Sequence, residues 1–118
     1  MKPFKTAVLA AVLSTLSVTS AVADSTYYCV GSVKSLMISP SGIVTATVGT
    51  ITSAYFCQIG ATVNGVTSDA CKAIHAQLLA ATVSNRQVRM YFNDSLSCTT
   101  HPAWSTLTGW YAGPEFVQ

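Results

Sequence analysis

The sequence predicts a mainly β domain with a single helix, and three observations carry that prediction. Short runs of β-branched and aromatic residues, some with alternating apolar and polar residues, recur along the chain. One alanine-rich segment, over about residues 69–83, has apolar residues at helical spacing instead. Glycine, proline and asparagine separate these segments, as expected for turns. The predicted order is three strands, one helix and two strands.

Residues 1–23 precede these segments and have the three parts of a cleaved signal peptide. Lys2 and Lys5 give a positive start, an apolar run covers residues 7–13, and Ala21-Val22-Ala23 is a small-residue cleavage site. The apolar run is much shorter than the roughly 20 residues that span a membrane. We therefore expect an exported protein, periplasmic or secreted, with one mature domain over residues 24–118 and no membrane span.

The first half of this domain predicts three strands, over residues 27–39, 43–48 and 51–59. In the second of them, apolar Val44, Ala46 and Val48 alternate with threonines, which is typical of a half-buried strand. Pro40-Ser41-Gly42 predicts the turn before it, and residues 63–66 predict a loop.

The helix is predicted to begin after Ser68, whose hydroxyl can cap an unpaired backbone N–H, and to end at Ser84-Asn85. Asp69 opposes the positive end of the helix dipole. Its buried face is predicted to hold four apolar residues: Cys71, Ile74, Leu78 and Leu79.

Residues 86–92 predict the fourth strand, with Val88, Met90 and Phe92 on one side and Gln87, Arg89 and Tyr91 on the other. A last, irregular strand is expected over residues 104–111, before Gly113-Pro114. This order fits a small five-stranded antiparallel barrel of the oligonucleotide/oligosaccharide-binding (OB) type, with the helix between strands three and four. An open α+β sandwich is the alternative.

The mature domain carries four basic and four acidic residues and therefore has no net charge: Lys34, Lys72, Arg86, Arg89, Asp24, Asp69, Asp94 and Glu115. Binding to nucleic acid or to an anionic membrane needs a basic surplus, so neither is expected. A surface with so few charges is poorly protected against self-association, which favours a homo-oligomer.

Four cysteines lie in the mature domain: Cys29, Cys57, Cys71 and Cys98. An even number in a small exported domain predicts two disulfides, and three pairings are open.

The sequence predicts no catalytic residues, no metal site and no cofactor. It has no G-x-S-x-G motif, its acids are scattered, and His75 and His101 are its only histidines. A small enzyme that uses these histidines is one alternative. Aromatic and hydroxyl-bearing side chains instead favour the binding of neutral ligands such as sugars. The candidate ligand-binding residues are Tyr27, Tyr28, Arg89 and Tyr91, whereas Tyr55 and Trp104 are expected in the core.

Three segments resemble the receptor-binding B subunits of subtilase-cytotoxin and pertussis-like toxins: Tyr55-Phe56-Cys57, Ala70-Cys71 at the start of the helix, and residues 87–92. Tyr27-Tyr28 also looks like the first strand of that family, so the resemblance covers about residues 27–92. It implies an OB-type barrel, a Cys57–Cys71 bridge with Cys29 then paired to Cys98, and a ring pentamer with helices lining a pore. It also implies recognition of sialylated or related glycans on host surfaces, so a glycan or other cell-surface receptor is the expected partner.

Cys29 stands where the toxin subunits have a serine that helps to hold the sugar, so their sugar contacts are not carried over to this chain. The second bridge of the family, late in its chain, also has no counterpart here. A periplasmic protein-interaction or inhibitor domain without a glycan ligand is therefore the second functional hypothesis.

Overall fold

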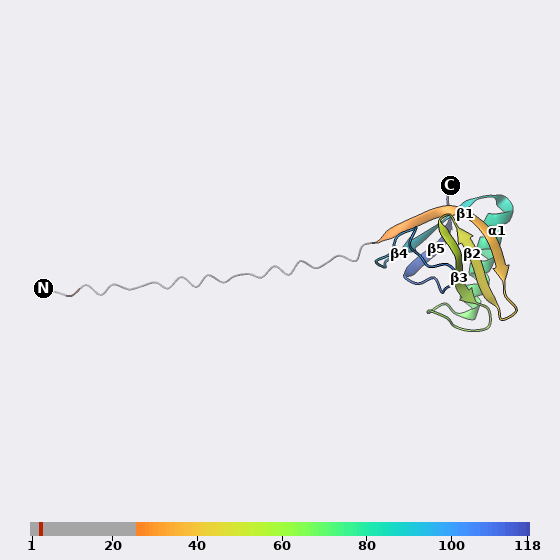
Figure 1. Cartoon of the computed structure of the whole chain (residues 1–118), viewed down its shortest axis with the longest axis horizontal. Coiled ribbons are helices and arrows are strands. Elements are labelled where there is room, and N and C mark those ends of the chain that lie inside the picture. The colour runs from red at the N-terminus through yellow and green to blue at the C-terminus, as the bar shows by residue number, and fades with distance from the viewer. Residues whose placement is uncertain (1–2, 4–25) are drawn as a thin grey trace.

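The computed structural model describes residue 3 and residues 26–118, which form five strands and one helix (Figure 1). The elements follow the chain in the predicted order: β1 (Tyr27–Ile38), β2 (Ile43–Val48), β3 (Ile51–Gln58), α1 (Ser68–Ser84), β4 (Gln87–Phe92) and β5 (Trp110–Phe116). Apart from residue 3, the predicted signal peptide lies outside the described residues.

The strands form one antiparallel sheet in the order β3-β2-β1-β4-β5. β1 is long and bends over the domain (Figure 1); residues 27–32 pair with β4 and residues 33–38 pair with β2. At the bend, Gly31 lies so close to Gly49 that a Cβ atom would come within 2.2 Å of the Gly49 backbone. A side chain at Gly31 would therefore force the strands apart.

The sheet is not closed into the expected barrel, because β3 and β5 are its two ends. Residues 104–107 run beside β3 instead. Both backbone polar groups of Tyr55 form hydrogen bonds with this segment. The Tyr55 N–H donates to Ser105 O, and the Tyr55 carbonyl accepts from Leu107 N. The segment thus covers part of the free edge of β3.

The predicted last strand over residues 104–111 was wrong, since β5 begins only at Trp110 and contains Gly113-Pro114. Trp104 and Gly109 have positive φ angles of 55° and 76°, so the chain turns twice before β5 starts. Proline is tolerated in β5 because this strand lies at the edge of the sheet.

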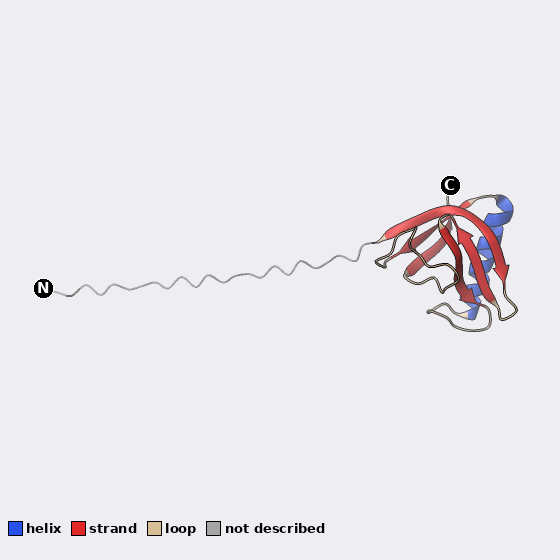
Figure 2. Ribbon diagram, viewed as in Figure 1, coloured by secondary structure: helices blue, strands red, loops and turns tan. Residues whose placement is uncertain are grey.

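The helix α1 packs against β1, β3 and β5 and lies beside the strands (Figure 2). Its N-cap is Thr67, not Ser68: the Thr67 hydroxyl accepts from Ala70 N at 3.2 Å, while the Ser68 hydroxyl accepts from Gly60 N. Asn85 ends the helix in the left-handed conformation. The buried residues are Cys71, Ile74, Leu78 and Ala81, so Leu79, 46% exposed, was wrongly placed in the core.

The core lies between the sheet and α1. The predicted inward residues of β2 and β4 are all buried: Val44, Ala46, Val48, Val88, Met90 and Phe92. Two disulfides join its parts, Cys29–Cys98 and Cys57–Cys71, which are the pairs that the resemblance implies. Among residues 26–118, no helix is long and apolar enough to cross a membrane.

Candidate ligand-binding surface

Three tyrosines form a row across the outer face of β1, β4 and β5: Tyr28, Tyr91 and Tyr111. The β1–β4 register places Tyr28 opposite Tyr91, with ring centroids 6.2 Å apart. The Tyr91 and Tyr111 centroids are 6.1 Å apart. Tyr28 and Tyr111 are 58% and 55% exposed, so the two ends of this tyrosine row are open to solvent.

Arg89 and Glu115 hold the middle of the tyrosine row in place. Arg89 lies two residues before Tyr91 on the same side of β4, and its guanidinium carbon is 4.9 Å from the centre of the Tyr28 ring. Arg89 Nη1 donates to the Tyr91 hydroxyl at 3.4 Å, and that hydroxyl donates to Glu115 Oε2 at 2.6 Å. The Tyr91 hydroxyl therefore has both partners within the protein, which leaves Tyr28 and Tyr111 as the exposed rings.

The charges in this surface balance each other. Arg89 Nη1 lies 3.9 Å from Glu115 Oε2, and the two residues are register partners. The hydrogen bond to Tyr91 is the main cause that raises the pKa of Arg89, and the nearby Glu115 carboxylate acts in the same direction. The surface thus offers aromatic rings and hydroxyls with no net charge.

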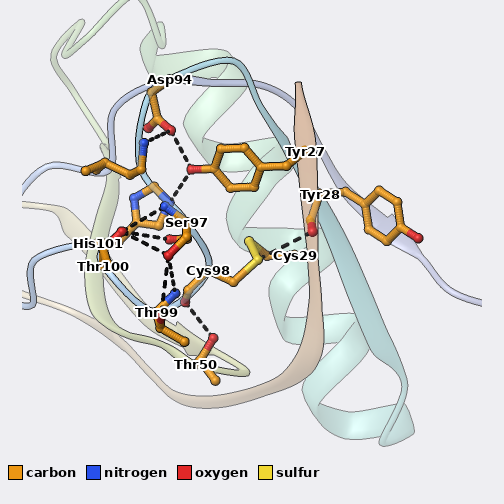
Figure 3. The surroundings of a disulfide bond; sticks show 11 residues. Tyr27, Tyr28, Cys29, Thr50, Asp94, Ser97, Cys98, Thr99, Thr100 and His101 are labelled. Carbon is orange, nitrogen blue, oxygen red and sulfur yellow. Dashed lines mark hydrogen bonds between the residues drawn. A yellow bond between two sulfur atoms is a disulfide. The ribbon is translucent and has the colours of Figure 1, made fainter. Parts of the chain in front are cut away.

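Tyr27 does not belong to this surface. Adjacent residues of a strand point to opposite faces, and Figure 3 shows Tyr27 and Tyr28 pointing away from each other. The Tyr27 hydroxyl donates to Asp94 Oδ1, and its oxygen lies 2.9 Å from His101 Nε2. Because the hydroxyl proton goes to Asp94, the Tyr27 oxygen accepts from His101 in the tautomer that carries its hydrogen on Nε2.

This polar cluster of Tyr27, Asp94 and His101 is shaped by burial. Burial raises the pKa of Tyr27, and the hydrogen bond to Asp94 and the charge of that carboxylate add to the effect. Burial also lowers the pKa of His101, which the Asp94 charge opposes. A phenol held in its protonated form is a poor base. The cluster instead joins residues 94–101 to β1 beside the Cys29–Cys98 bridge (Figure 3).

The structure therefore brings together three of the four predicted ligand-binding residues, Tyr28, Arg89 and Tyr91, and places Tyr27 elsewhere. Sequence reasoning missed Tyr111 and Glu115, because both depend on the position of β5, which was predicted too early in the chain. Trp104, expected in the core, is 60% exposed, and Tyr55 is half-buried. Trp104 lies in the segment beside β3. Its backbone N–H donates to Ser53 O, and its side chain is left exposed to solvent.

Within the described part of the chain, no three His, Cys, Asp or Glu residues are grouped so that they could hold a metal ion. Comparisons with models of protein families, with curated proteins and with solved structures found no match to this chain.

Proposed function

We propose that this chain is an exported, non-enzymatic binding domain that recognises a glycan through the tyrosine row. The single observation that carries the proposal is the exposure of Tyr28 and Tyr111 at the two ends of a row fixed by Arg89 and Glu115. Sugar rings stack their apolar C–H faces on aromatic rings, while neighbouring hydroxyls and amides meet the sugar hydroxyls.

Preorganisation supports this assignment. Tyrosine offers a large contact area with few rotatable bonds, so little entropy is lost on binding. Tyr91 loses still less, because its hydroxyl is already bonded to two neighbours. The pairing of Arg89 with Glu115 leaves the surface without net charge, which suits a neutral section of a glycan better than a strongly anionic ligand.

Export and fold support the proposal less directly. Two disulfides fit an oxidising compartment. The segment beside β3 covers the sheet edge that an OB-type barrel would close, so we regard the fold as an open relative of that barrel.

We also propose a homo-oligomer, with a pentamer as the state that the toxin resemblance implies. The outward side of α1 supports it, since Leu79 and Val83 are 46% and 77% exposed.

A glycan array with the mature protein tests the proposed function. We expect binding that falls about tenfold or more in Tyr28→Ala and Tyr111→Ala, equivalent to at least about 1.4 kcal/mol. Tyr28→Phe keeps the ring and is the matched control, so it should retain most of the binding.

Two results would contradict the proposal: no glycan bound at high protein concentration, or binding that both alanine variants leave unchanged. Rows of Tyr and Arg also occur at protein interfaces. Capture of a stoichiometric protein partner from a periplasmic extract, lost in Tyr28→Ala, would favour the protein-interaction hypothesis instead.

A further inference from the structure

A second surface lies over the other half of the sheet, where Trp104 borders a small hollow. The hollow has a volume of about 150 Å³ and is lined by Met37, Ile38, Ser39, Ile43, Thr45, Tyr55 and Trp104. It shares no residue with the tyrosine row. A neighbouring hollow of the same size shares Ile43 and Tyr55 with it.

Thr45 is the unusual residue of this hollow. It lies between Met37 of β1 and Tyr55 of β3 in the register and is only 4% exposed. Its neighbours Val44 and Ala46 are buried in the core, so the Thr45 side chain lies on the other face of β2, where it lines the hollow. Its hydroxyl has no hydrogen-bond partner among the described residues. The Thr45 oxygen is not among the buried side-chain atoms that lack a partner, so it is reached from the hollow and can bond a polar group that enters it.

The size and charge of the hollow restrict what it can hold. Its volume is about half that of the smallest typical pocket for a drug-sized ligand, so it accepts one substituent and not a whole ligand. No charged residue lines it, so neither a carboxylate nor an ammonium group would find a counter-charge there. Met37, Ile38 and Ile43 give apolar walls, and the exposed Trp104 gives an aromatic platform at the rim.

We propose that this hollow is a second saccharide site, specific for an uncharged pyranose that carries an acetamido group. The sugar ring stacks on the Trp104 indole. The acetamido methyl group contacts the apolar walls, and its amide bonds the Thr45 hydroxyl, which can both donate and accept. This site goes beyond the tyrosine row, because it lies on β2, β3 and the end of β1 and selects for a defined substituent.

Titration with methyl N-acetyl-β-glucosaminide, followed by ¹H–¹⁵N NMR of the full mature protein, tests the site. We expect a saturable shift of the Trp104 indole N–H signal. The Trp110 indole N–H, which donates to Leu107 O at 3.0 Å, is the internal control and should stay in place. Methyl β-glucoside, which lacks the acetamido group, should bind at least tenfold more weakly.

Two variants make the test specific. Trp104→Ala should abolish binding, and Thr45→Val should weaken it about tenfold. Valine keeps the shape of threonine and removes a hydroxyl that has no hydrogen-bond partner within the described part of the chain. The fold should therefore be retained, and an unmoved Trp110 signal would verify this. Tyr28→Ala should leave binding at this site unchanged.

Three results would overturn the assignment. The first is the absence of any Trp104 shift with the N-acetyl sugar, whatever happens at the tyrosine row. The second is equal binding by Thr45→Val and the unmodified protein. The third is a Trp104 signal that shifts with protein concentration alone, which would show that a second copy of the chain covers the hollow. Loss of glycan binding at the tyrosine row would refute only the function proposed above.

Discussion

Tyr27 and Tyr28 are adjacent in the chain, yet the sheet gives them different tasks. Tyr28 is exposed in the tyrosine row, while Tyr27 is half-buried and bonded to Asp94 and His101. Asp94 Oδ1 accepts from the Tyr27 hydroxyl and from Leu96 N, while its Oδ2 atom is buried without a hydrogen-bond partner among the described residues. That atom lies where a side chain at Gly109 would have to fit.

We therefore expect Tyr27→Phe to lower the free energy of unfolding by about 2 kcal/mol, the usual cost of losing a hydrogen bond to a charged group. For a domain of this size, that is a fall of about 10 °C in Tm. Tyr28→Phe is the control and should change stability by less than about 0.5 kcal/mol, because that hydroxyl has no hydrogen bond among the described residues. Equal melting temperatures for the two variants would show that the cluster does not stabilise the fold.

His101 makes stability depend on pH. Burial lowers the pKa of His101 in the folded state, so the unfolded chain takes up the proton first as the pH falls below about 6.5. The contribution of neutral His101 to the free energy of unfolding is thus fully present above that pH. It is lost as the pH falls toward the pKa of His101 in the folded state. We expect the free energy of unfolding, measured with urea, to decrease between pH 7.5 and 5.5.

His101→Gln supplies the comparison for this pH dependence, because the glutamine amide can still donate to Tyr27 but does not titrate. The slope between pH 7.5 and 5.5 should be smaller in this variant. An unchanged slope would assign the pH dependence to other groups.

At the scale of elements, the Cys57–Cys71 bridge joins the end of β3 to the first turn of α1. Replacement of both cysteines by alanine avoids a free thiol. We expect it to cost about 3 kcal/mol from the unfolded-chain entropy of a loop of this length, in addition to lost packing of two buried side chains. Urea unfolding measures the loss, and an unchanged midpoint would mean that the bridge contributes nothing.

The elements that sequence predicted well are those whose side chains alternate or repeat regularly. In β4, Val88, Met90 and Phe92 are buried as expected, and Arg89 and Tyr91 face outward together. The same alternation correctly predicted that Arg89 and Tyr91 of the candidate site lie on one face of β4. The prediction of strand positions fails where the chain turns. Nothing local in residues 104–111 shows that Thr106 pairs with β3 and that β5 starts later. Since β5 was misplaced, Tyr111 and Glu115 could not be assigned to the site.

The start of the helix and the exposure of Trp104 show the same limit. Thr67 and Ser68 are both good capping residues, and only the loop that places Gly60 N beside the Ser68 hydroxyl decides between them. Trp104 is apolar, so composition favours a buried position. Its left-handed backbone and its pairing to Ser53 leave the side chain outside. Contacts with other segments decide both outcomes: Gly60 decides the helix start, and Ser53 decides the position of Trp104.

At the scale of the whole molecule, charge is scarce, and the exposed aromatic residues of the described part lie on two separate surfaces. The tyrosine row covers the start of β1 with β4 and β5, whereas Trp104 and its hollow cover the end of β1 with β2 and β3. Ion pairing among the described residues is limited to Lys72–Asp69 and Arg89–Glu115. With so little charge to keep copies apart, we propose that copies of the chain meet at the exposed apolar side chains of α1.

We expect the native mass of the mature protein to be a multiple of the chain mass, and five-fold if the toxin resemblance extends to assembly. Leu79 and Val83 are the large apolar residues exposed on α1, and burying them between copies removes apolar surface from water. Leu79→Glu with Val83→Glu should lower the mass toward that of a single chain, because an assembled helix face would have to bury two unpaired carboxylates. Lys72→Gln, on the same helix, should leave the mass unchanged. A single-chain mass at all concentrations for the unmodified protein would remove the argument for assembly and favour a monomeric protein-interaction domain.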